Sequence, residues 1–180
     1  MKHVLGICGS ASQNSTNLSI LRRIAALSAA NFRMEIIDDL TVFPHFTTAQ
    51  TLAHVPKQIE EIRAKIDQAD GVIICTPAYV FSIPSGLKNI IEWCVSTTVF
   101  TDKPTGLITA SAHGEKGHAE LTLIMQTLQA TLSEKTSLLI QGVKGKVTTE
   151  GEIVDPKTAE ALSLVVQSFS DLLLSATSTK

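Results

Sequence analysis

The stretch Gly71–Trp93 constrains the fold of this chain more than any other part of the sequence. It begins with the apolar, β-branched run 72–75, which is typical of a strand covered on both faces in a parallel sheet. Segment 76–84 has a proline near each end, which predicts a rigid connection. Apolar residues then recur at helical spacing from Leu87 to Val95. The stretch therefore predicts a strand, a structured loop and a helix, which make up half of a βαβ unit. The alternative interpretation of the same residues is an ordinary connection between strand and helix, with incidental prolines.

The same alternation of strand and helix patterns continues along almost the whole chain. We expect strands at 3–8, 33–37, 72–75, 104–110 and 137–140, and helices at 18–27, 57–69, 87–95, 119–132 and 156–172, with a further extended edge segment at 144–154. Short connections and right-handed crossovers make a doubly wound, five-stranded parallel sheet with helices on both faces the natural fold. The strand order 2-1-3-4-5 would bring the loops after strands one, three and four together at one switch point.

The composition fits a single globular domain that spans residues 1–180. Apolar residues make up 44% and charged residues 18%, which argues against a disordered chain. The net charge of −2 gives no reason to expect nucleic acid or an anionic membrane surface as a partner. We find no signal-peptide layout and no apolar run long enough to span a bilayer, so we expect a cytoplasmic protein.

Cys8, Cys75 and Cys94 lie in strand or helix patterns and are expected to be buried thiols. Cys8 and Cys75 would stand at adjacent strand ends, so a redox pair is the alternative to simple packing. No histidine spacing suits a metal site, and we expect no bound metal.

The first predicted strand runs into a loop of small polar residues that precedes a helix. The N–H groups and the positive dipole end of a helix N-terminus attract anions, and hydroxyl and amide donors suit phosphate oxygens. A helix cap alone would need only one such residue. The chain has neither GxGxxG nor GxxxxGK[ST], and Asn14 stands where a phosphatase-type cradle would need arginine. We therefore expect a phosphate to be bound by Gly9, Ser10, Ser12, Ser15, Thr16 and Asn17.

Together the three loops would form one site. The loop after the first strand would bind the phosphate, the loop after the third strand would supply the aromatic side chain of Tyr79, and the loop after the fourth strand would supply small residues from Ser111 onward. The sequence shows no obvious nucleophile and base set, and His113 is the best candidate for a proton donor. A site with binding groups and no catalytic side chains indicates that a cofactor carries the reaction.

Three motifs carry a resemblance to a known family: the Gly9–Asn17 loop, the run TPAYVFSIPSGLKNIIEW from Thr76 to Trp93, and the Ser111 loop. The second motif is the specific one. In these motifs the chain resembles the NADPH-dependent FMN reductases, which have a flavodoxin-like fold and include quinone, azo-dye and chromate reductases. The resemblance implies bound FMN, NADPH or NADH as hydride donor, a small-molecule electron acceptor, and a homodimer or homotetramer.

The resemblance also implies roles for single residues. Ser10, Ser15 and Asn17 would hold the FMN phosphate, and Pro77 and Tyr79 would lie along the isoalloxazine ring and ribityl chain. Ser111, with the backbone of Ala112 and His113, would approach the pyrimidine edge. Leu87, Lys88, Asn89 and Trp93 would be structural. The residues expected to bind the cofactor are Gly9, Ser10, Ser12, Ser15, Thr16, Asn17, Thr76, Pro77, Ala78, Tyr79, Val80, Ser111, Ala112 and His113.

The chain departs from the family pattern at three positions. Many members have arginine where this chain has Ser12, and the family often has Glu and Asn where this chain has Ala78 and Val80. The missing arginine removes a charge-assisted phosphate contact, so we expect weaker FMN binding or a different acceptor site.

We expect hydride transfer through FMN to a quinone-like, azo or free flavin acceptor, with ping-pong kinetics. The alternatives are a flavin-binding electron carrier without reductase turnover and a flavin-free module that binds a phosphate ligand. Dedicated carriers tend to be strongly acidic, which a net charge of −2 does not match.

Overall fold

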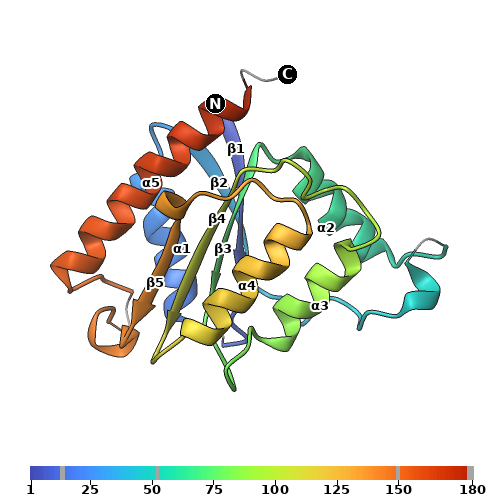
Figure 1. The fold of residues 1–180 in the computed structure, drawn as a ribbon, viewed down its shortest axis with the longest axis horizontal. Helices are drawn as coiled ribbons and strands as arrows, with labels where there is room; N and C mark the ends of the chain where they lie inside the picture. Colours follow the sequence, from blue (N-terminus) through green and yellow to red (C-terminus); the bar gives the residue numbers. More distant parts are fainter. Residues whose placement is uncertain (13–14, 52, 149–150, 178–180) are drawn as a thin grey trace.

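A computed structural model describes residues 1–12, 15–51, 53–148 and 151–177 of the chain. Five parallel strands form one sheet in the order β2-β1-β3-β4-β5, and helices cover both faces (Figure 1). The strand order and the class of fold are therefore confirmed. The strands are β1 (Lys2–Cys8), β2 (Phe32–Ile37), β3 (Gly71–Thr76), β4 (Thr105–Ser111) and β5 (Ser137–Gln141), and the helices are α1 (Thr16–Leu27), α2 (Lys57–Gln68), α3 (Ser85–Cys94), α4 (Glu115–Thr127) and α5 (Pro156–Thr177).

The sheet separates two hydrophobic clusters, because side chains alternate along each strand. Ile73 of β3 faces the side covered by α1 and α5, where Phe32 and Phe169 pack edge to face with ring centroids 5.7 Å apart. Ile74 faces the other side, under α2, α3 and α4, together with the fully buried Trp93. Burying each large aliphatic side chain contributes about 1.5–3 kcal/mol, so a strand buried on both faces anchors the whole sheet.

The parallel register places the carboxyl ends of the strands at one edge of the sheet, at the bottom of Figure 1. Cys8 pairs with Cys75, and Thr76 pairs with Thr109 on the other side of β3. The N–H of Gly9 donates to the carbonyl of Cys75 at 2.8 Å, so the first loop leaves the sheet already attached to β3. The loops after β1, β3 and β4 therefore emerge side by side.

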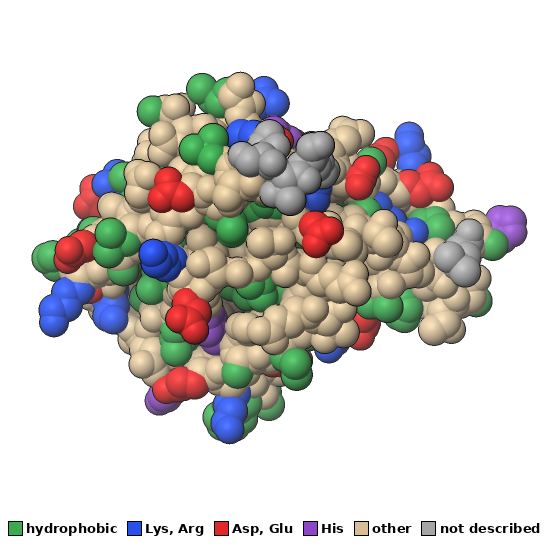
Figure 2. Space-filling view, turned by 45° about the horizontal axis from the view of Figure 1, so that its top comes forward, with side chains coloured by type: hydrophobic (Ala, Val, Ile, Leu, Met, Phe, Trp, Pro, Cys, Tyr) green, Lys and Arg blue, Asp and Glu red, His purple; other side chains and the backbone are tan. Residues whose placement is uncertain are grey.

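Polar contacts join neighbouring elements at the amino edge of the sheet, around a hollow of about 410 Å³. Asp70 accepts from Lys2 Nζ at 2.8 Å and from the N–H of His3 at 2.7 Å. Lys103 Nζ donates to the carbonyls of Asp67 and Ala69 at 2.8 and 2.7 Å. Figure 2 turns this end of the molecule toward the viewer and shows acidic and basic side chains interspersed over the face.

Helix α4 begins earlier and ends earlier than the expected range 119–132. Gly114 precedes it with a φ of 93°, a left-handed conformation that glycine adopts without strain. The helix ends at Thr127 because Gln129 turns the chain with a φ of 60°. Gly117 made the sequence look loop-like, but this glycine lies inside the helix because of a close packing contact described below.

None of the described residues of the expected edge segment at 144–154 joins the sheet. Its described residues include a short 3₁₀ helix (Val143–Gly145) and one isolated antiparallel bridge between Val147 and Ile153. Residues 149 and 150 lie outside the described part of the chain. Two other 3₁₀ helices, η1 (Thr48–Gln50) and η2 (Glu134–Thr136), lie in the loops before α2 and β5.

The expectation that no apolar run could span a bilayer was wrong by length and composition. Residues Pro156–Ala176 of α5 form a helix of 21 residues with a mean hydropathy of 1.2, enough to cross a membrane. In this fold the helix is amphipathic: Leu162 and Phe169 are fully buried, whereas Leu164 and Leu174 are exposed. The buried face packs on α1 and the sheet, as a core helix of an α/β domain does.

Candidate functional site

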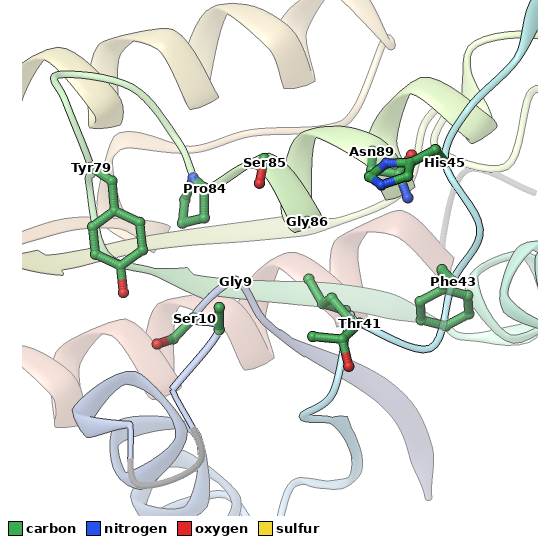
Figure 3. A pocket seen from close by; sticks show the side chains of 12 residues that line it. Gly9, Ser10, Thr41, Phe43, His45, Tyr79, Pro84, Ser85, Gly86 and Asn89 are labelled. Carbon is green, nitrogen blue, oxygen red and sulfur yellow. The ribbon is translucent and has the colours of Figure 1, made fainter.

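Two hollows open side by side at the carboxyl edge of the sheet. The first has a volume of about 340 Å³ and lies between the loop after β1, the loop after β2 and the start of α3 (Figure 3). The second has a volume of about 420 Å³ and lies between the loop after β3 and the start of α4. The first is lined by Gly9, Ser10, Ala11, Leu40, Thr41, Phe43, His45, Tyr79, Pro84, Ser85, Gly86 and Asn89, and the second by Ala78, Val80, Phe81, Ser111, Ala112, His113, Gly114, Glu115, Lys116 and Gly117.

The loop after β1 presents hydroxyl groups at the N-terminus of α1. Ser15 caps the helix by accepting from the N–H of Asn17 at 3.2 Å, and Ser10 accepts from the N–H of Ser12 at 3.2 Å. Both serines are buried. A hydroxyl that accepts one bond still has its own hydrogen to donate, so these serines suit an anion placed over the helix end. Thr16 is the first residue of the helix.

Asn17 points into the protein rather than along the loop. Its amide donates to the carbonyl of Ala110 at 3.3 Å and accepts from the thiol of Cys75 at 3.4 Å. The side chain is buried and ties α1 to the ends of β3 and β4. The expected contact of Asn17 with a phosphate stays a prediction. Its two hydrogen bonds also hold the loops after β1, β3 and β4 together.

Cys8 and Cys75 are register partners, as expected, and both are buried free thiols. Burial raises the pKa of Cys8, and burial together with the nearby Cys8 raises the pKa of Cys75 well above its ordinary value. Burial also raises the pKa of Cys94 to about 12. Because the thiolate is the reactive form, these cysteines suit packing better than redox chemistry.

Gly9 allows the loop after β1 (the first loop) and the loop after β3 (the third loop) to touch. A Cβ atom at this position would lie 2.3 Å from Thr76 Oγ1 and 2.9 Å from Leu87 Cδ2, closer than packed atoms can approach. Thr76 and Pro77 are buried at the end of β3. The hydroxyl of Thr76 donates to the carbonyl of Pro77 at 3.0 Å, which fixes the start of the third loop.

The loop after β3 folds into a tight turn at Tyr79–Ser82. The N–H of each end residue donates to the carbonyl of the other, at 2.9 and 3.0 Å. Val80 and Phe81 have φ angles of 50° and 63°, a left-handed region that costs ordinary residues about 1–2 kcal/mol each. Both tip side chains are exposed, and the tip projects at the bottom of Figure 1. Figure 3 shows Tyr79 at one end of the first hollow with its ring directed toward Ser10.

The loop after β4 meets the third loop directly. The hydroxyl of Ser111 donates to the carbonyl of Ala78 at 3.3 Å. Ala112 and His113 are exposed and line the second hollow, opposite Val80. His118 lies on α4 instead, where its ring nitrogens contact Thr109 Oγ1 at 2.8 Å and Ser137 Oγ at 2.9 Å, and burial lowers its pKa.

Sequence reasoning missed the loop after β2, which forms one wall of the first hollow. Leu40, Thr41, Phe43 and His45 line the hollow from this loop. Asn89 holds the loop by accepting from the N–H of Phe46 at 2.8 Å and donating to the carbonyl of Pro44 at 3.0 Å, and Trp93 Nε1 donates to the same carbonyl at 2.8 Å. The signal available in the sequence was the motif with Asn89 and Trp93, whose structural role these bonds show.

The electrostatic surroundings of the first loop are mixed. A smaller hollow of about 240 Å³ brings Ser10 and Ser12 next to Asp38 and Asp39. Hydrogen bonds from Thr41 lower the pKa of Asp39, so this carboxylate is charged at neutral pH. Two carboxylates beside a phosphate site oppose anion binding, and Ser12 brings no compensating charge.

The described residues nevertheless fit a flat, phosphorylated cofactor. The buried serines at the α1 N-terminus have donors that suit a phosphate. Tyr79, at one end of the turn in the third loop, lies beside the first loop. The loops after β1, β3 and β4 lie at the same edge, as the sequence predicted. Comparison with known proteins agrees with this reading, since residues 2–144 match the model of the family described as NADPH-dependent FMN reductase.

The chain belongs to this family of NADPH-dependent FMN reductases. Curated relatives include an NADH:(hydroxy)cinnamate reductase subunit of Vibrio ruber, 32% identical over 92% of this chain and 84% of the relative. A quinone reductase of Escherichia coli K12 is 28% identical over 94% of both chains. Among solved structures, the flavoenzyme NAD(P)H:(acceptor) oxidoreductase FerB of Paracoccus denitrificans superposes with a TM-score of 0.86, at 22% identity over 98% of this chain and 99% of that chain.

Membership fixes the coarse function of this FMN reductase. It is an oxidoreductase that uses FMN together with NADPH or NADH, which confirms the resemblance, the cofactor and the enzyme class. The flavodoxin-like fold is confirmed by the strand order and by the solved neighbours. The residue-by-residue cofactor contacts stay predictions.

Proposed function

We propose that this FMN reductase transfers hydride from NADPH or NADH to an uncharged, flat, conjugated acceptor, with a quinone as the leading class and azo compounds or free flavin as further members. The first hollow supports this choice. Its walls include the apolar side chains of Leu40, Phe43 and Pro84. Among the described residues that line it, none is lysine, arginine, aspartate or glutamate, so the part of the hollow away from Ser10 suits an uncharged acceptor.

Bound FMN would supply the hydride-accepting and hydride-donating chemistry, and the protein supplies binding and orientation. Ser10 and Ser15, with the N-terminus of α1, would hold the phosphate. Tyr79 would limit the position of the flavin ring at the boundary of the two hollows. The buried Pro77 would support the ring from the end of β3.

The loop after β4 would serve the polar edge of the ring. Ser111 already orients the third loop through its bond to Ala78. The backbone N–H groups of Ala112 and His113 would donate to the pyrimidine edge, where negative charge develops on reduction. His113, exposed beside the same hollow, is the proposed proton donor to that edge or to the acceptor.

A spectroscopic titration tests the cofactor and the reaction class together. The purified protein should show flavin absorbance, and NADPH added without oxygen should bleach it. Subsequent addition of a quinone should restore the absorbance. A colourless protein that cannot be loaded with FMN would favour a flavin-free phosphate-ligand module, and flavin that NADPH does not reduce would favour an electron carrier.

Steady-state kinetics test whether the two substrates use the same space in turn. Varying NADPH at several quinone concentrations should give parallel double-reciprocal lines, the ping-pong pattern. Intersecting lines, which require both substrates to be bound together, would contradict this part of the proposal.

We also propose that the enzyme works in the cytoplasm as a homodimer or homotetramer, without nucleic acid or membrane partners. The net charge of −2 supports the absence of anionic partners. Light scattering of the purified protein, with and without lipid vesicles, would measure both the oligomer and any membrane binding.

A further inference from the structure

The turn Tyr79–Ser82 has a conformation that its own residues disfavour. Two positive φ angles in a two-residue turn are the pattern that Asn-Gly sequences prefer, whereas this chain has Val80 and Phe81 there. A β-branched residue in this region is a marked outlier. Val80 is 93% exposed and Phe81 is 80% exposed, so the packing of these side chains does not hold the turn. Contacts at the base of the turn must hold it.

Glu120 of α4 supplies these contacts. Its Oε2 accepts from the hydroxyl of Ser82 at 2.6 Å and from the N–H of Ile83 at 3.1 Å. Hydrogen bonds to a carboxylate are shorter and stronger than bonds between neutral groups. The other oxygen, Oε1, lies 3.9 Å from Lys88 Nζ, which is a longer and weaker contact. One carboxylate therefore holds both a side chain and the backbone at the base of the turn.

Gly117 brings the helix close enough for this contact. A Cβ atom at Gly117 would lie 2.8 Å from the Cβ of Ala78 and 3.3 Å from the carbonyl oxygen of Ser82. The first turn of α4 thus packs against the backbone of the third loop. Glu120 follows three residues later on the same helix face, which aims its carboxylate at the same loop.

We propose that Glu120 is a positioning residue of the flavin site. By binding Ser82 and Ile83 it holds the turn in its strained conformation, and it thereby fixes Tyr79 at the boundary of the two hollows. The effect on the turn is a property of the protein alone. The effect on FMN rests on the function proposed above.

Proteolysis of the FMN-free, full-length protein tests the effect on the turn. Chymotrypsin cleaves after aromatic residues, so Tyr79 and Phe81 report on the opening of the turn. Glu120→Ala should be cleaved there at least about tenfold faster than the parent protein, because two bonds to a carboxylate are lost. Glu120→Gln should remain close to the parent, because its amide oxygen can accept the same two bonds.

Lys88→Gln is the matched control, since it removes the neighbouring charge and leaves both bonds to the turn. It should be cleaved at the parent rate. Ser82→Ala removes one of the two bonds and should give an intermediate rate, which decides the matter if Glu120→Ala does not fold. Parent-like cleavage of folded Glu120→Ala, or of Ser82→Ala where Glu120→Ala is unfolded, would overturn the proposal. So would equal acceleration in Lys88→Gln.

A double-mutant cycle tests the link to FMN. Glu120→Ala should weaken FMN binding by about tenfold in the native turn, measured by quenching of flavin fluorescence. In a background with Val80→Asn and Phe81→Gly, which favours the turn by itself, the same change should cost less than about threefold. Equal losses in both backgrounds would show that Glu120 acts in some way other than through the turn.

The two kinds of failure are distinguishable. If the parent protein binds no FMN, the proposed function fails, and the protease rates still decide whether Glu120 holds the turn. If the parent binds FMN and the cleavage rates do not respond to Glu120, the positioning role fails while the function stands.

Discussion

The two edges of the sheet differ in the charge of the side chains that line their hollows. At the amino edge, Asp70 and Lys103 bind groups from neighbouring elements at distances of 2.7–2.8 Å. They line a hollow of about 410 Å³ there, together with Lys2, Asp67 and Asp102, whereas the first hollow at the carboxyl edge has no lysine, arginine, aspartate or glutamate among its described lining residues. A hollow without charged side chains suits a flat, largely apolar ring better than one lined by ion pairs, so we propose that the flavin site lies at the carboxyl edge. Changes at the carboxyl edge should therefore alter FMN binding, and changes at the amino edge should alter only stability.

The largest expected effect is that of Gly9→Ala at the carboxyl edge. The added methyl group would overlap Thr76 and Leu87, so we expect FMN binding to fall more than about a hundredfold and stability to fall by about 2–3 kcal/mol. Flavin titration and thermal unfolding measure the two effects. Gly145→Ala is the control, because nothing lies within 4 Å of its added Cβ atom. Tight FMN binding by Gly9→Ala would mean that the first and third loops need not touch.

Ser12→Arg should have the next largest effect, in the opposite direction. An arginine here would give the phosphate loop a charge-assisted contact and would face Asp38 and Asp39, so FMN binding should tighten by about tenfold. Flavin titrations at low and high salt measure the gain, which should shrink as salt screens the charges. Ser12→Gln is the neutral control. An arginine variant with unchanged affinity would indicate that the phosphate lies away from this residue.

Asp70→Asn tests the amino edge. Burial raises the pKa of Asp70, but the bonds from Lys2 and from the N–H of His3 outweigh it, so the pKa lies below its ordinary value. The resulting stabilisation is present above the unfolded pKa of about 3.9 and is lost as the pH falls through the folded pKa. We expect the variant to lose about 1 kcal/mol at pH 7, less at pH 3, with FMN affinity unchanged. Denaturant unfolding at the two pH values measures the loss, and a change in FMN affinity would break the contrast between the edges.

The smallest expected effect concerns His118, which lies in the first turn of α4. Burial lowers its pKa, so the unfolded chain takes up a proton at about pH 6.5 before the folded protein does. Stability should therefore fall by up to about 1 kcal/mol between pH 7 and pH 5, and His118→Gln should flatten that slope. Unfolding curves across this range provide the measurement. An unchanged slope in the variant would assign the pH dependence to other groups.

Much of the fold could be predicted because its patterns are local. The apolar run at 72–75 and the helical spacing after Pro84 identified β3 and α3 within a few residues. The three loops at the carboxyl edge followed from the strand order. The start of α4 was placed too late, because Gly117 resembles a loop residue until its contact with Ala78 is seen.

The wall of the first hollow could not be predicted in the same way. Leu40 and Phe43 belong to a long loop without a periodic pattern, and Asn89 holds that loop from 45 residues away in the sequence. The bond from Ser82 to Glu120 likewise joins residues 38 positions apart. Neither contact produces a periodic pattern or a motif in the sequence.

The sequence by itself determined the order of strands and helices, the edge at which we propose the site and the family of the enzyme. Only the tertiary structure decided which side chains share a hollow, that Asn17 faces the core, and that Glu120 reaches the turn. The physical reason is that periodicity and loop composition depend on neighbours along the chain, whereas hydrogen bonds and close packing depend on where distant segments meet after folding.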